Sequence, residues 1–291
     1  MFGILLIVCA VSCFAGLDSS AKWLSQSVSP MQIAAVRYLG SFFLSLLLLR
    51  LWRQPQIVKT SRLKLQFLRS LCLVAATLCN FTALSFIPLT ETTAINFSSP
   101  LMVSLLATFF LGETIGPRRV IAVIVGFAGV LLITRPGGAG VHWADGLAFL
   151  AAIANAFYSI TTRLLARHDR PETTMFYTGL AGSLVLLPVL PFVWHTPDSF
   201  AVWIMLGATG VIGAVAHWLL ILAHKHAGAS LLAPFYYIQL VGAALLGRIV
   251  FGETPDRWTL LGGLIVIGSG LYVFYREQIR KKEALTRTAS A

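Results

Sequence analysis

Charged side chains are rare inside the long apolar segments of this chain, and Asp18 and Arg37 are two of the few. In a bilayer such a residue costs about 2.5–3.5 kcal/mol on insertion scales, so it needs a structural or functional reason to be there. Arg37 could bind an anionic substrate group, and Asp18 could accept a coupling proton. The alternative is a structural ion pair between the two. Lys22, four residues after Asp18, competes for the same carboxylate through helical spacing.

His217 is a third ionisable residue, midway along a later apolar segment. An unperturbed imidazole has a pKa of about 6.5, so this side chain could carry a proton at physiological pH. The alternative is a neutral histidine that hydrogen-bonds between helices. His217 is therefore a candidate for substrate binding and, together with Asp18, for proton coupling.

Polar residues and prolines also gather near the middle of two apolar segments that lie about 140 residues apart. These residues are Asn96, Ser99 and Pro100 in the first segment and Pro234, Tyr236, Tyr237 and Gln239 in the second. Polar groups at mid-depth in transporters commonly line a cavity. Because proline removes a helix hydrogen bond, Pro100 and Pro234 are predicted hinges. Ordinary hydrogen bonding between helices, worth about 0.6 kcal/mol per bond, is the alternative.

Three further polar residues, Asn80, Asn155 and Tyr158, could complete the same wall with Arg37 and His217. Tyrosines there could stack on a planar substrate, although tyrosines near helix ends are more often interface anchors. The four cysteines form no CxxC pair and lie in apolar segments, so we expect buried thiols rather than a disulfide or a metal site. No catalytic residue and no cofactor is predicted.

The elements that position these residues must be membrane helices. Hydrophobic residues make up 57% of the chain and charged residues 11%, against roughly 25% charged in soluble domains. The mean hydropathy is +0.81. One soluble core could not bury this much apolar surface, so lipid must solvate it. The net charge of +11 sits in short gaps between apolar runs, where membrane orientation explains it better than nucleic-acid binding does.

About twenty apolar residues cross a bilayer, and by this measure the chain has ten predicted helices. They cover 2–22, 31–51, 66–86, 91–111, 118–134, 145–166, 173–193, 199–222, 229–250 and 257–276. With the N-terminus in the cytoplasm, most of the 22 Lys and Arg residues, Arg69 among them, fall on the cytoplasmic side. The positive-inside rule therefore predicts a multi-pass protein of the inner (plasma) membrane with both termini in the cytoplasm.

A short motif repeats after about 140 residues, as Leu111-Gly112-Glu113-Thr114 and again as Phe251-Gly252-Glu253-Thr254. We therefore predict two repeats, 1–136 and 141–277, followed by a basic cytoplasmic tail at 278–291. Because each repeat has five helices, the second is inverted in the membrane, an arrangement that suits alternating access. Glu113 and Glu253 could be gating residues. The favoured interpretation is a glycine that ends a helix, followed by a solvated carboxylate that bonds the start of the next helix.

Several of these segments together resemble the EamA family of the drug/metabolite transporter (DMT) superfamily, over essentially the whole chain. The matching segments are Ala35-Val36-Arg37-Tyr38-Leu39, Ser98-Ser99-Pro100-Leu101, Asp145-Gly146, Asn155-Ala156-Phe157-Tyr158-Ser159, Pro234 to Leu240 and Phe251-Gly252-Glu253. The resemblance implies ten helices in two EamA repeats and transport of a small metabolite, such as an amino acid, riboflavin, S-adenosylmethionine or a metal-chelating compound. Many members carry Trp in helices one and six, where this chain has Gly16-Leu17-Asp18 and Asn155-Ala156.

The predicted function is secondary transport of a small polar or amphipathic metabolite by alternating access. Export is the leading direction, and uptake of a vitamin- or nucleoside-like compound is the alternative. The chain has no GxxxxGK[ST] motif, so ATP does not drive it directly. A membrane-embedded enzyme and a scaffold or sensor are the competing classes. The sequence has no cluster of His, Asp or Glu to support the enzyme and no predicted soluble domain that would relay a signal. The predicted partners are a small molecule and lipid, with a homodimer to consider and no nucleic acid.

Overall fold

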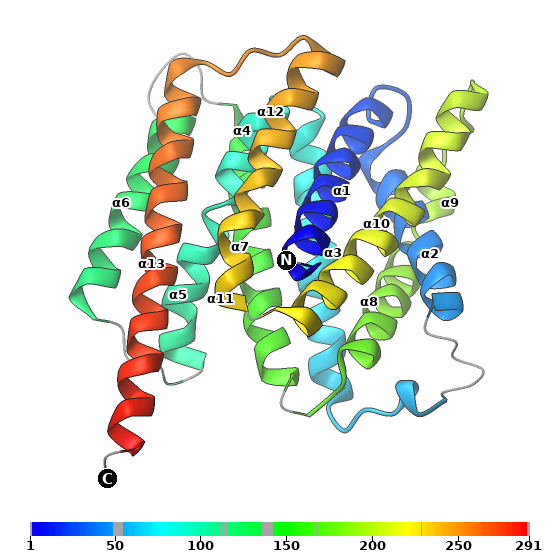
Figure 1. Ribbon diagram of the computed structural model, residues 1–291. Coiled ribbons are helices and arrows are strands. Elements are labelled where there is room, and N and C mark those ends of the chain that lie inside the picture. Colours follow the sequence, from blue (N-terminus) through cyan, green and yellow to red (C-terminus); the bar gives the residue numbers. More distant parts are fainter. Residues whose placement is uncertain are drawn as a thin grey trace.

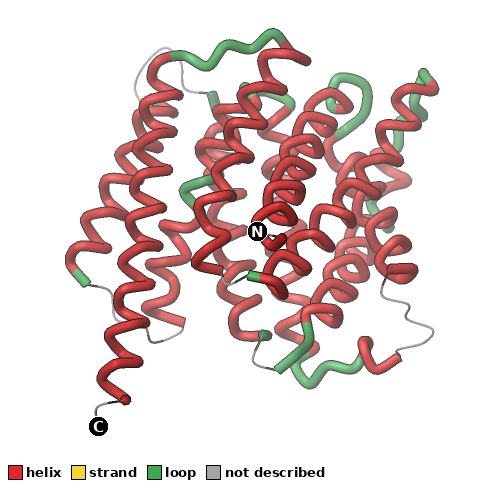
Figure 2. Tube along the Cα trace, viewed as in Figure 1, coloured by secondary structure: helices red, strands yellow, loops and turns green. Residues whose placement is uncertain are grey.

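The computed structural model describes residues 2–48, 55–110, 112, 116–135, 142–166, 168–227 and 229–289, and every regular element in these ranges is a helix (Figure 1, Figure 2). The first half contains α1 (Phe2–Leu24), α2 (Pro30–Leu48), η1 (Pro55–Val58), α3 (Leu63–Leu84), α4 (Leu89–Asn96), α5 (Ser99–Phe110) and α6 (Pro117–Thr134). The second half contains α7 (Trp143–Leu165), α8 (Pro171–Leu186), α9 (Leu190–Val193), α10 (Phe200–His226), α11 (Ala229–Leu232), η2 (Ala233–Tyr237), α12 (Ile238–Phe251) and α13 (Arg257–Ala289).

Within the described residues, nine helical segments are long and apolar enough to cross a membrane, as expected for an all-α integral membrane protein. The span predicted at 173–193 is divided into α8 and α9, with Pro188 between them. Proline cannot donate the backbone hydrogen bond that would continue the helix. The count of ten spans therefore stays a prediction. At the other end of the chain, α13 continues as a helix through most of the tail predicted at 278–291.

Helices from the two halves interlock in the bundle. The first helix, α1, packs on α10 and α12, while α2 packs on α8 and α10, α3 on α7 and α8, and α6 on α13. Small residues allow the closest approaches. A Cβ atom at Gly210 in α10 would lie 2.8 Å from the Cα atom of Gly40 in α2, so the two backbones pack without intervening side chains. Tight contact between the halves lets one site draw on helices of both.

The fourth helix of each half is interrupted within the described residues. In the first half, Phe97 and Ser98 separate α4 from α5, and Pro100 lies in the first turn of α5. In the second half, α11 and the 3-10 helix η2, which contains Pro234, precede α12. Discontinuous helices of this kind expose backbone groups at transporter binding sites. Hinge movement at the two prolines stays a prediction.

The repeated glycine of the two motifs has the same unusual backbone in both halves. Gly112 has a φ of 66° and Gly252 a φ of 68°. Gly252 is the left-handed C-cap of α12, a conformation that costs a residue with a side chain roughly 1–2 kcal/mol. Glycine therefore takes the left-handed conformation in both copies, and in the second copy it ends α12 and directs Glu253.

Gly252→Ala is expected to lower the free energy of unfolding by about 1 kcal/mol, because alanine is strained in the left-handed region. The apparent Tm of the detergent-purified protein measures this effect. Gly207→Ala in α10 is the matched control, since its added Cβ meets open space and alanine favours the helix. A fall in Tm of the same size in both variants would contradict the explanation.

Candidate functional site

Four polar side chains from four helices form one hydrogen-bonded chain at the centre of the bundle, here called the amide cluster. The carboxylate of Asp18 in α1 accepts hydrogen bonds from the amides of Asn80 in α3, at 3.1 Å, and Gln239 in α12, at 3.3 Å. Asn80 Oδ1 in turn accepts a hydrogen bond from Asn96 Nδ2 in α4 at 2.7 Å. Residues singled out separately in the sequence thus meet in one place, and Gln239 brings the second half of the chain to the first.

The carboxylate of Asp18 is held by neutral amides rather than by a paired cation. The positive charge of Arg37 acts on it, but the ion pairs of the described residues lie elsewhere, at Lys22–Glu253 and Arg135–Asp256. The expected competition of Lys22 for Asp18 is therefore wrong, because Lys22 extends to Glu253 instead. Asp18 is partly exposed and has amide donors but no ion-pair partner among the described residues, so its carboxylate can still accept a cationic group of a ligand.

Arg37 is buried in α2 beside an aromatic and hydroxyl lining. Its Nη1 donates a hydrogen bond to Thr77 Oγ1 at 3.0 Å, and the Tyr38 hydroxyl shares the same Thr77 oxygen at 3.0 Å. The guanidinium lies over the rings of Tyr38 and Phe81, 5.1 and 5.7 Å from their centroids. Its Nε is buried and has no hydrogen-bond partner in the described part of the chain, so one N–H stays available to an incoming acceptor.

Arg69 is a buried residue that the sequence placed among the charges of the cytoplasmic side, near the start of the helix predicted at 66–86. Its side chain donates to Thr162 Oγ1 at 2.7 Å, to Thr178 Oγ1 at 2.6 Å, to the carbonyl of Thr174 at 3.3 Å and to the hydroxyl of Tyr158 at 2.7 Å. One arginine thereby joins α3 to α7 and α8. The available signal was the helix predicted at 66–86, which already contained Arg69; in the structure α3 begins at Leu63, so Arg69 lies almost two turns inside it.

The other predicted site residues lie around these centres. The ring of His217 meets Phe14 edge to face at 5.1 Å, and the charges of both Arg37 and Arg69 act on it. Tyr236 packs on the apolar cluster that contains Leu6 and Ile7. These contacts leave the proposed roles of His217 and Tyr236 as predictions.

Tyr237, Ser99 and Asn155 are placed outside the amide cluster. The ring of Tyr237 packs against that of Phe97 at a tilt, with the two ring centroids 5.0 Å apart. Ser99 is buried at the start of α5, and the carbonyl of Asn155 accepts a hydrogen bond from the Ser159 hydroxyl within α7. None of the three side chains bonds to the amide cluster within the described structure, so their assignment to the substrate site rests on sequence alone.

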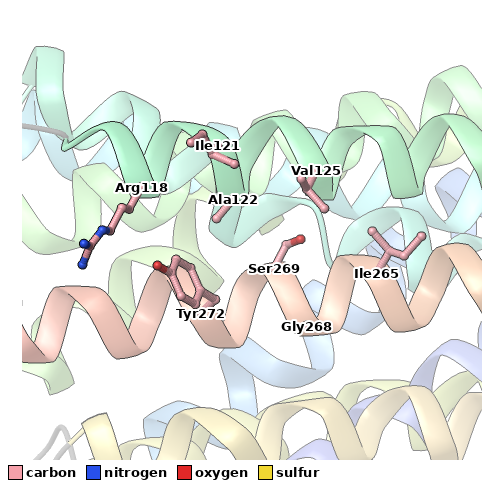
Figure 3. A pocket seen from close by; sticks show the side chains of 8 residues that line it. All are labelled: Arg118, Ile121, Ala122, Val125, Ile265, Gly268, Ser269 and Tyr272. Carbon is pink, nitrogen blue, oxygen red and sulfur yellow. The ribbon is translucent and has the colours of Figure 1, made fainter.

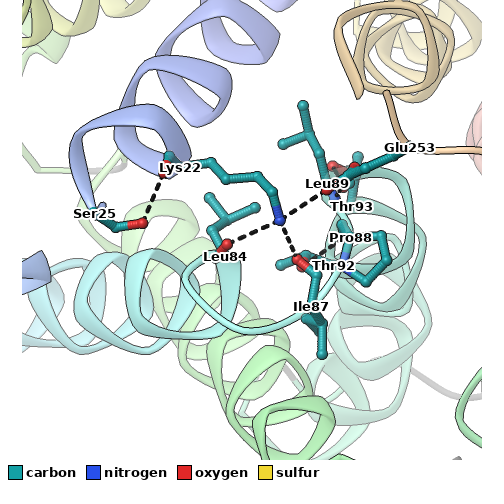
Figure 4. Close-up of polar contacts among 9 residues, drawn as sticks. All are labelled: Lys22, Ser25, Leu84, Ile87, Pro88, Leu89, Thr92, Thr93 and Glu253. Atoms are coloured by element: carbon teal, nitrogen blue, oxygen red, sulfur yellow. Dashed lines mark hydrogen bonds and ion pairs between the residues drawn. The ribbon is translucent and has the colours of Figure 1, made fainter. Parts of the chain in front are cut away.

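Glu253, which ends the second repeat motif, is neither solvated nor bonded to the next helix. Its Oε1 pairs with Lys22 Nζ at 2.9 Å, and its Oε2 accepts the backbone N–H of Leu89 at 2.9 Å (Figure 4). The favoured sequence interpretation is thus wrong for Glu253, because the turn after Gly252 directs the carboxylate back to α4. Its counterpart Glu113 lies outside the described residues.

A second ion pair lies nearby on the same face, between Arg135 and Asp256 at 2.7 Å. Partial burial raises the pKa of Asp256, but hydrogen bonds from Thr259 and the charge of Arg135 outweigh that effect and bring the pKa below its ordinary value. Both side chains are more than a third exposed. The Arg135–Asp256 pair therefore contributes little to stability.

A shallow groove of about 400 Å³ runs between α6 and α13 (Figure 3). It is lined by Arg118, Ile121, Ala122, Val125, Ile265, Gly268, Ser269 and Tyr272. None of these residues belongs to the amide cluster or contacts Arg37 or Arg69. The lining is mostly apolar, as expected of a helix surface that faces lipid.

All four cysteines are free. Cys9 is exposed at the surface of α1, so the expectation of buried thiols is wrong for that residue. An exposed apolar thiol on a membrane helix needs no partner, because lipid solvates it.

The named relatives of this chain are all transporters of small molecules. The chain is 31% identical to a protein of Rickettsia bellii named as an S-adenosylmethionine uptake transporter, over 90% of this chain and 89% of that protein. It is 30% identical to a riboflavin transporter of Vibrio cholerae, over 93% of this chain and 92% of that protein. It is 29% identical to a pseudopaline exporter of Pseudomonas aeruginosa, over 91% and 93%.

The fold is also known from experiment. A chain in a crystal structure aligns with 93% of this chain and 95% of its own length, with a TM-score of 0.64 and 20% sequence identity. The model of the EamA-like transporter family matches residues 1–135 and again residues 142–275. The protein is therefore a multi-pass membrane transporter and not an enzyme. By its sequence and its double match, this chain belongs to the EamA-like transporter family.

Proposed function

We propose that this protein is a secondary transporter that brings an S-adenosylmethionine-like compound into the cell by alternating access. The proposal includes two inverted repeats, 1–136 and 141–277, and cytoplasmic termini. It takes uptake rather than the export that the sequence favoured, because two relatives at 31% and 30% identity are named for uptake, whereas the relative named for export is 29% identical. Inverted repeats allow inward- and outward-open states of similar energy, so the substrate gradient or a coupled proton sets the direction.

The observation that carries the proposal is a pair of opposite charges, Asp18 and Arg37, neither of which has an ion-pair partner among the described residues. Asp18 has only amide donors, and Arg37 retains a buried Nε–H without an acceptor in the described part of the chain. The charge of Arg37 acts on Asp18, so the two groups belong to one electrostatic site. A zwitterionic ligand would satisfy both groups at once.

S-adenosylmethionine has such an end, with a carboxylate for Arg37 and an ammonium and a sulfonium for Asp18. Its adenine can hydrogen-bond to the side-chain amides of Asn96 and Gln239, which present both donors and acceptors. Riboflavin has no amino-acid end and would leave both charges unsatisfied. An unpaired buried charge costs several kcal/mol, so this site favours the zwitterion over the flavin.

Uptake of radiolabelled S-adenosylmethionine, by cells that produce the protein and by matched cells that do not, tests the proposal. We expect uptake that unlabelled S-adenosylmethionine inhibits and riboflavin does not. Export of S-adenosylmethionine from preloaded vesicles, with no uptake by cells, would show that transport runs outward and contradict the proposed direction. Inhibition by riboflavin at the same concentration would overturn the substrate class.

Arg37→Gln is expected to raise the KM for uptake about tenfold or more, because the carboxylate of the substrate loses a charged hydrogen-bond donor. Initial uptake rates over a range of substrate concentrations measure this change. Arg257→Gln, at an exposed arginine beside Trp258, is the control and should leave KM unchanged. Equal KM values for wild type and Arg37→Gln would remove Arg37 from the site.

A further inference from the structure

An ion pair joins the two halves of the chain at one end of the helix bundle. Lys22 lies in the last turn of α1, and Glu253 follows the end of α12. Their charged groups are 2.9 Å apart, and their side chains are only 14% and 17% exposed. Under the proposed topology this end faces the outside of the cell. We call Lys22 and Glu253 the outer latch.

Each charge of the outer latch also holds a helix end (Figure 4). Lys22 Nζ donates to the carbonyls of Leu84, at 3.1 Å, and Ile87, at 2.6 Å, where α3 ends. Glu253 Oε2 accepts the N–H of Leu89, where α4 begins. A cation at a helix C-terminus and an anion at an N-terminus both match the helix dipoles. The outer latch therefore fixes α1, α3, α4 and α12, the same four helices that supply the amide cluster.

We propose that the outer latch closes the external entrance to the amide cluster and must open once in every transport cycle. The inference rests on the alternating access of the proposed function. A transporter cannot admit substrate from outside while α1 and α12 are tied across the cavity at that end. This structure is then the state with its outer side closed.

The opposite end of the bundle differs at the equivalent position. The helices α1 and α7 have the same length, and their alignment from end to end makes Arg163 the counterpart of Lys22. Arg163 is exposed, and no ion pair holds it within the described residues. Lys22 is only 14% exposed whereas Arg163 is exposed, so the two ends of the bundle differ in the burial of this basic residue.

The energetics suit a contact that opens repeatedly. Removing one partner of a buried ion pair is costly because the other charge is left buried and unpaired. Opening the outer latch in wild type hydrates both charges together and leaves neither buried. The pair can therefore hold the closed state without locking it, and a variant that lacks one charge should shift the equilibrium toward the open state.

A reporter cysteine at Thr92 tests this proposal without knowledge of the substrate. Thr92 is 1% exposed, lies one turn after Leu89 in α4, and its carbonyl accepts a hydrogen bond from Asn96. It therefore lies between the outer latch and the amide cluster. In a version with the four native cysteines replaced, Thr92→Cys is treated with a membrane-impermeant maleimide on intact cells, and the labelling rate is measured.

Labelling of the parent is expected to be slow, and Glu253→Gln should accelerate it about tenfold. This substitution is informative because glutamine still accepts the N–H of Leu89 and loses only the charge. Lys22→Gln should have the same effect. Arg135→Gln is the matched control. It removes the Arg135–Asp256 ion pair, whose side chains are 45% and 39% exposed, and it should not change the labelling rate.

The double variant Lys22→Glu with Glu253→Lys separates an outer latch from a plain ion pair. A plain pair would be restored by the exchange. In the double variant the carboxylate would face the C-terminal end of α3 and the ammonium group the N-terminal end of α4, and both contacts are electrostatically unfavourable. The maleimide should therefore label this variant as fast as the single variants.

Three results would overturn the proposal or divide it from the proposed function. If Glu253→Gln and Lys22→Gln are labelled as slowly as the parent and keep its gel-filtration profile, the ion pair is a static structural contact and not a latch. Acceleration confined to inverted vesicles would place this end in the cytoplasm and overturn the outer assignment. Acceleration on intact cells without S-adenosylmethionine uptake in wild type would support the outer latch and reject the proposed substrate.

Discussion

Asp18→Asn is expected to reduce uptake by about 10- to 100-fold while the protein remains in the membrane at wild-type abundance. In wild type, two amide donors point at the two carboxylate oxygens. Asparagine has one oxygen and one NH₂ group in place of the two carboxylate oxygens. Either the amide of Asn80 or that of Gln239 would therefore face the NH₂ group and lose its acceptor. A buried group left unsatisfied costs about 1–3 kcal/mol, and the substrate also loses its counter-charge. Initial uptake rates, normalised to immunoblotted protein, measure the effect.

The same variant tests proton coupling. If the carboxyl group of Asp18 carries the proton, the pH dependence of uptake that remains in Asp18→Asn should be flatter than in wild type. Ser20→Ala is the control, because the hydroxyl of Ser20 bonds only to the carbonyl of Gly16 in its own helix. A wild-type pH profile in Asp18→Asn would assign the proton to another group, with His217 the next candidate.

Gln239→Ala and Asn96→Ala should also reduce uptake without loss of protein. Each removes one amide from the hydrogen-bonded chain that runs from Asn96 through Asn80 and Asp18 to Gln239. The expected reduction is smaller, about three- to tenfold, because the carboxylate keeps a partner in each case. Wild-type flux in both variants would show that the amide cluster is a structural contact rather than the substrate site.

Arg69→Met is expected to have the largest effect on stability, lowering the free energy of unfolding by about 3 kcal/mol. The guanidinium makes four hydrogen bonds in a buried setting and lies 4.4 Å from the ring of Tyr158. Methionine fills much of the volume but leaves three hydroxyl groups and a carbonyl without their donor. The apparent Tm in detergent and the membrane abundance measure the loss.

Two further variants test whether the hydrogen bonds of Arg69 are the cause of the lost stability. Arg69→Lys should recover only part of the stability, because an ammonium group cannot reproduce the planar fork that joins α3 to α7 and α8. Arg163→Gln, at an exposed arginine of α7, should leave the Tm unchanged. A wild-type Tm in Arg69→Met, with uptake abolished, would instead place Arg69 in the substrate path.

Hydropathy and spacing were sufficient for the membrane class and the repeat. Apolar segments of bilayer length specify helices because every backbone polar group in lipid must be satisfied within the helix. The paired Gly-Glu motifs showed the duplication, and the matching φ angles of Gly112 and Gly252 explain why both copies need glycine. The sequence also identified Asp18, Asn80, Asn96 and Gln239 as exceptional, because each is a polar residue in an apolar segment.

Only the tertiary structure decided which of these residues meet. The spacing of Lys22 and Asp18 on one helix suggested a contact, yet Lys22 bonds Glu253, more than 200 residues away in the chain. Arg69 was counted only as a charge of the cytoplasmic side, yet its four partners lie on α7 and α8. The hydrophobic periodicity of a segment indicates which side of its helix faces lipid, and this is a local property of the sequence. The pairing of polar groups depends on how helices distant in sequence are packed and rotated against one another, and that is settled only when the whole bundle assembles.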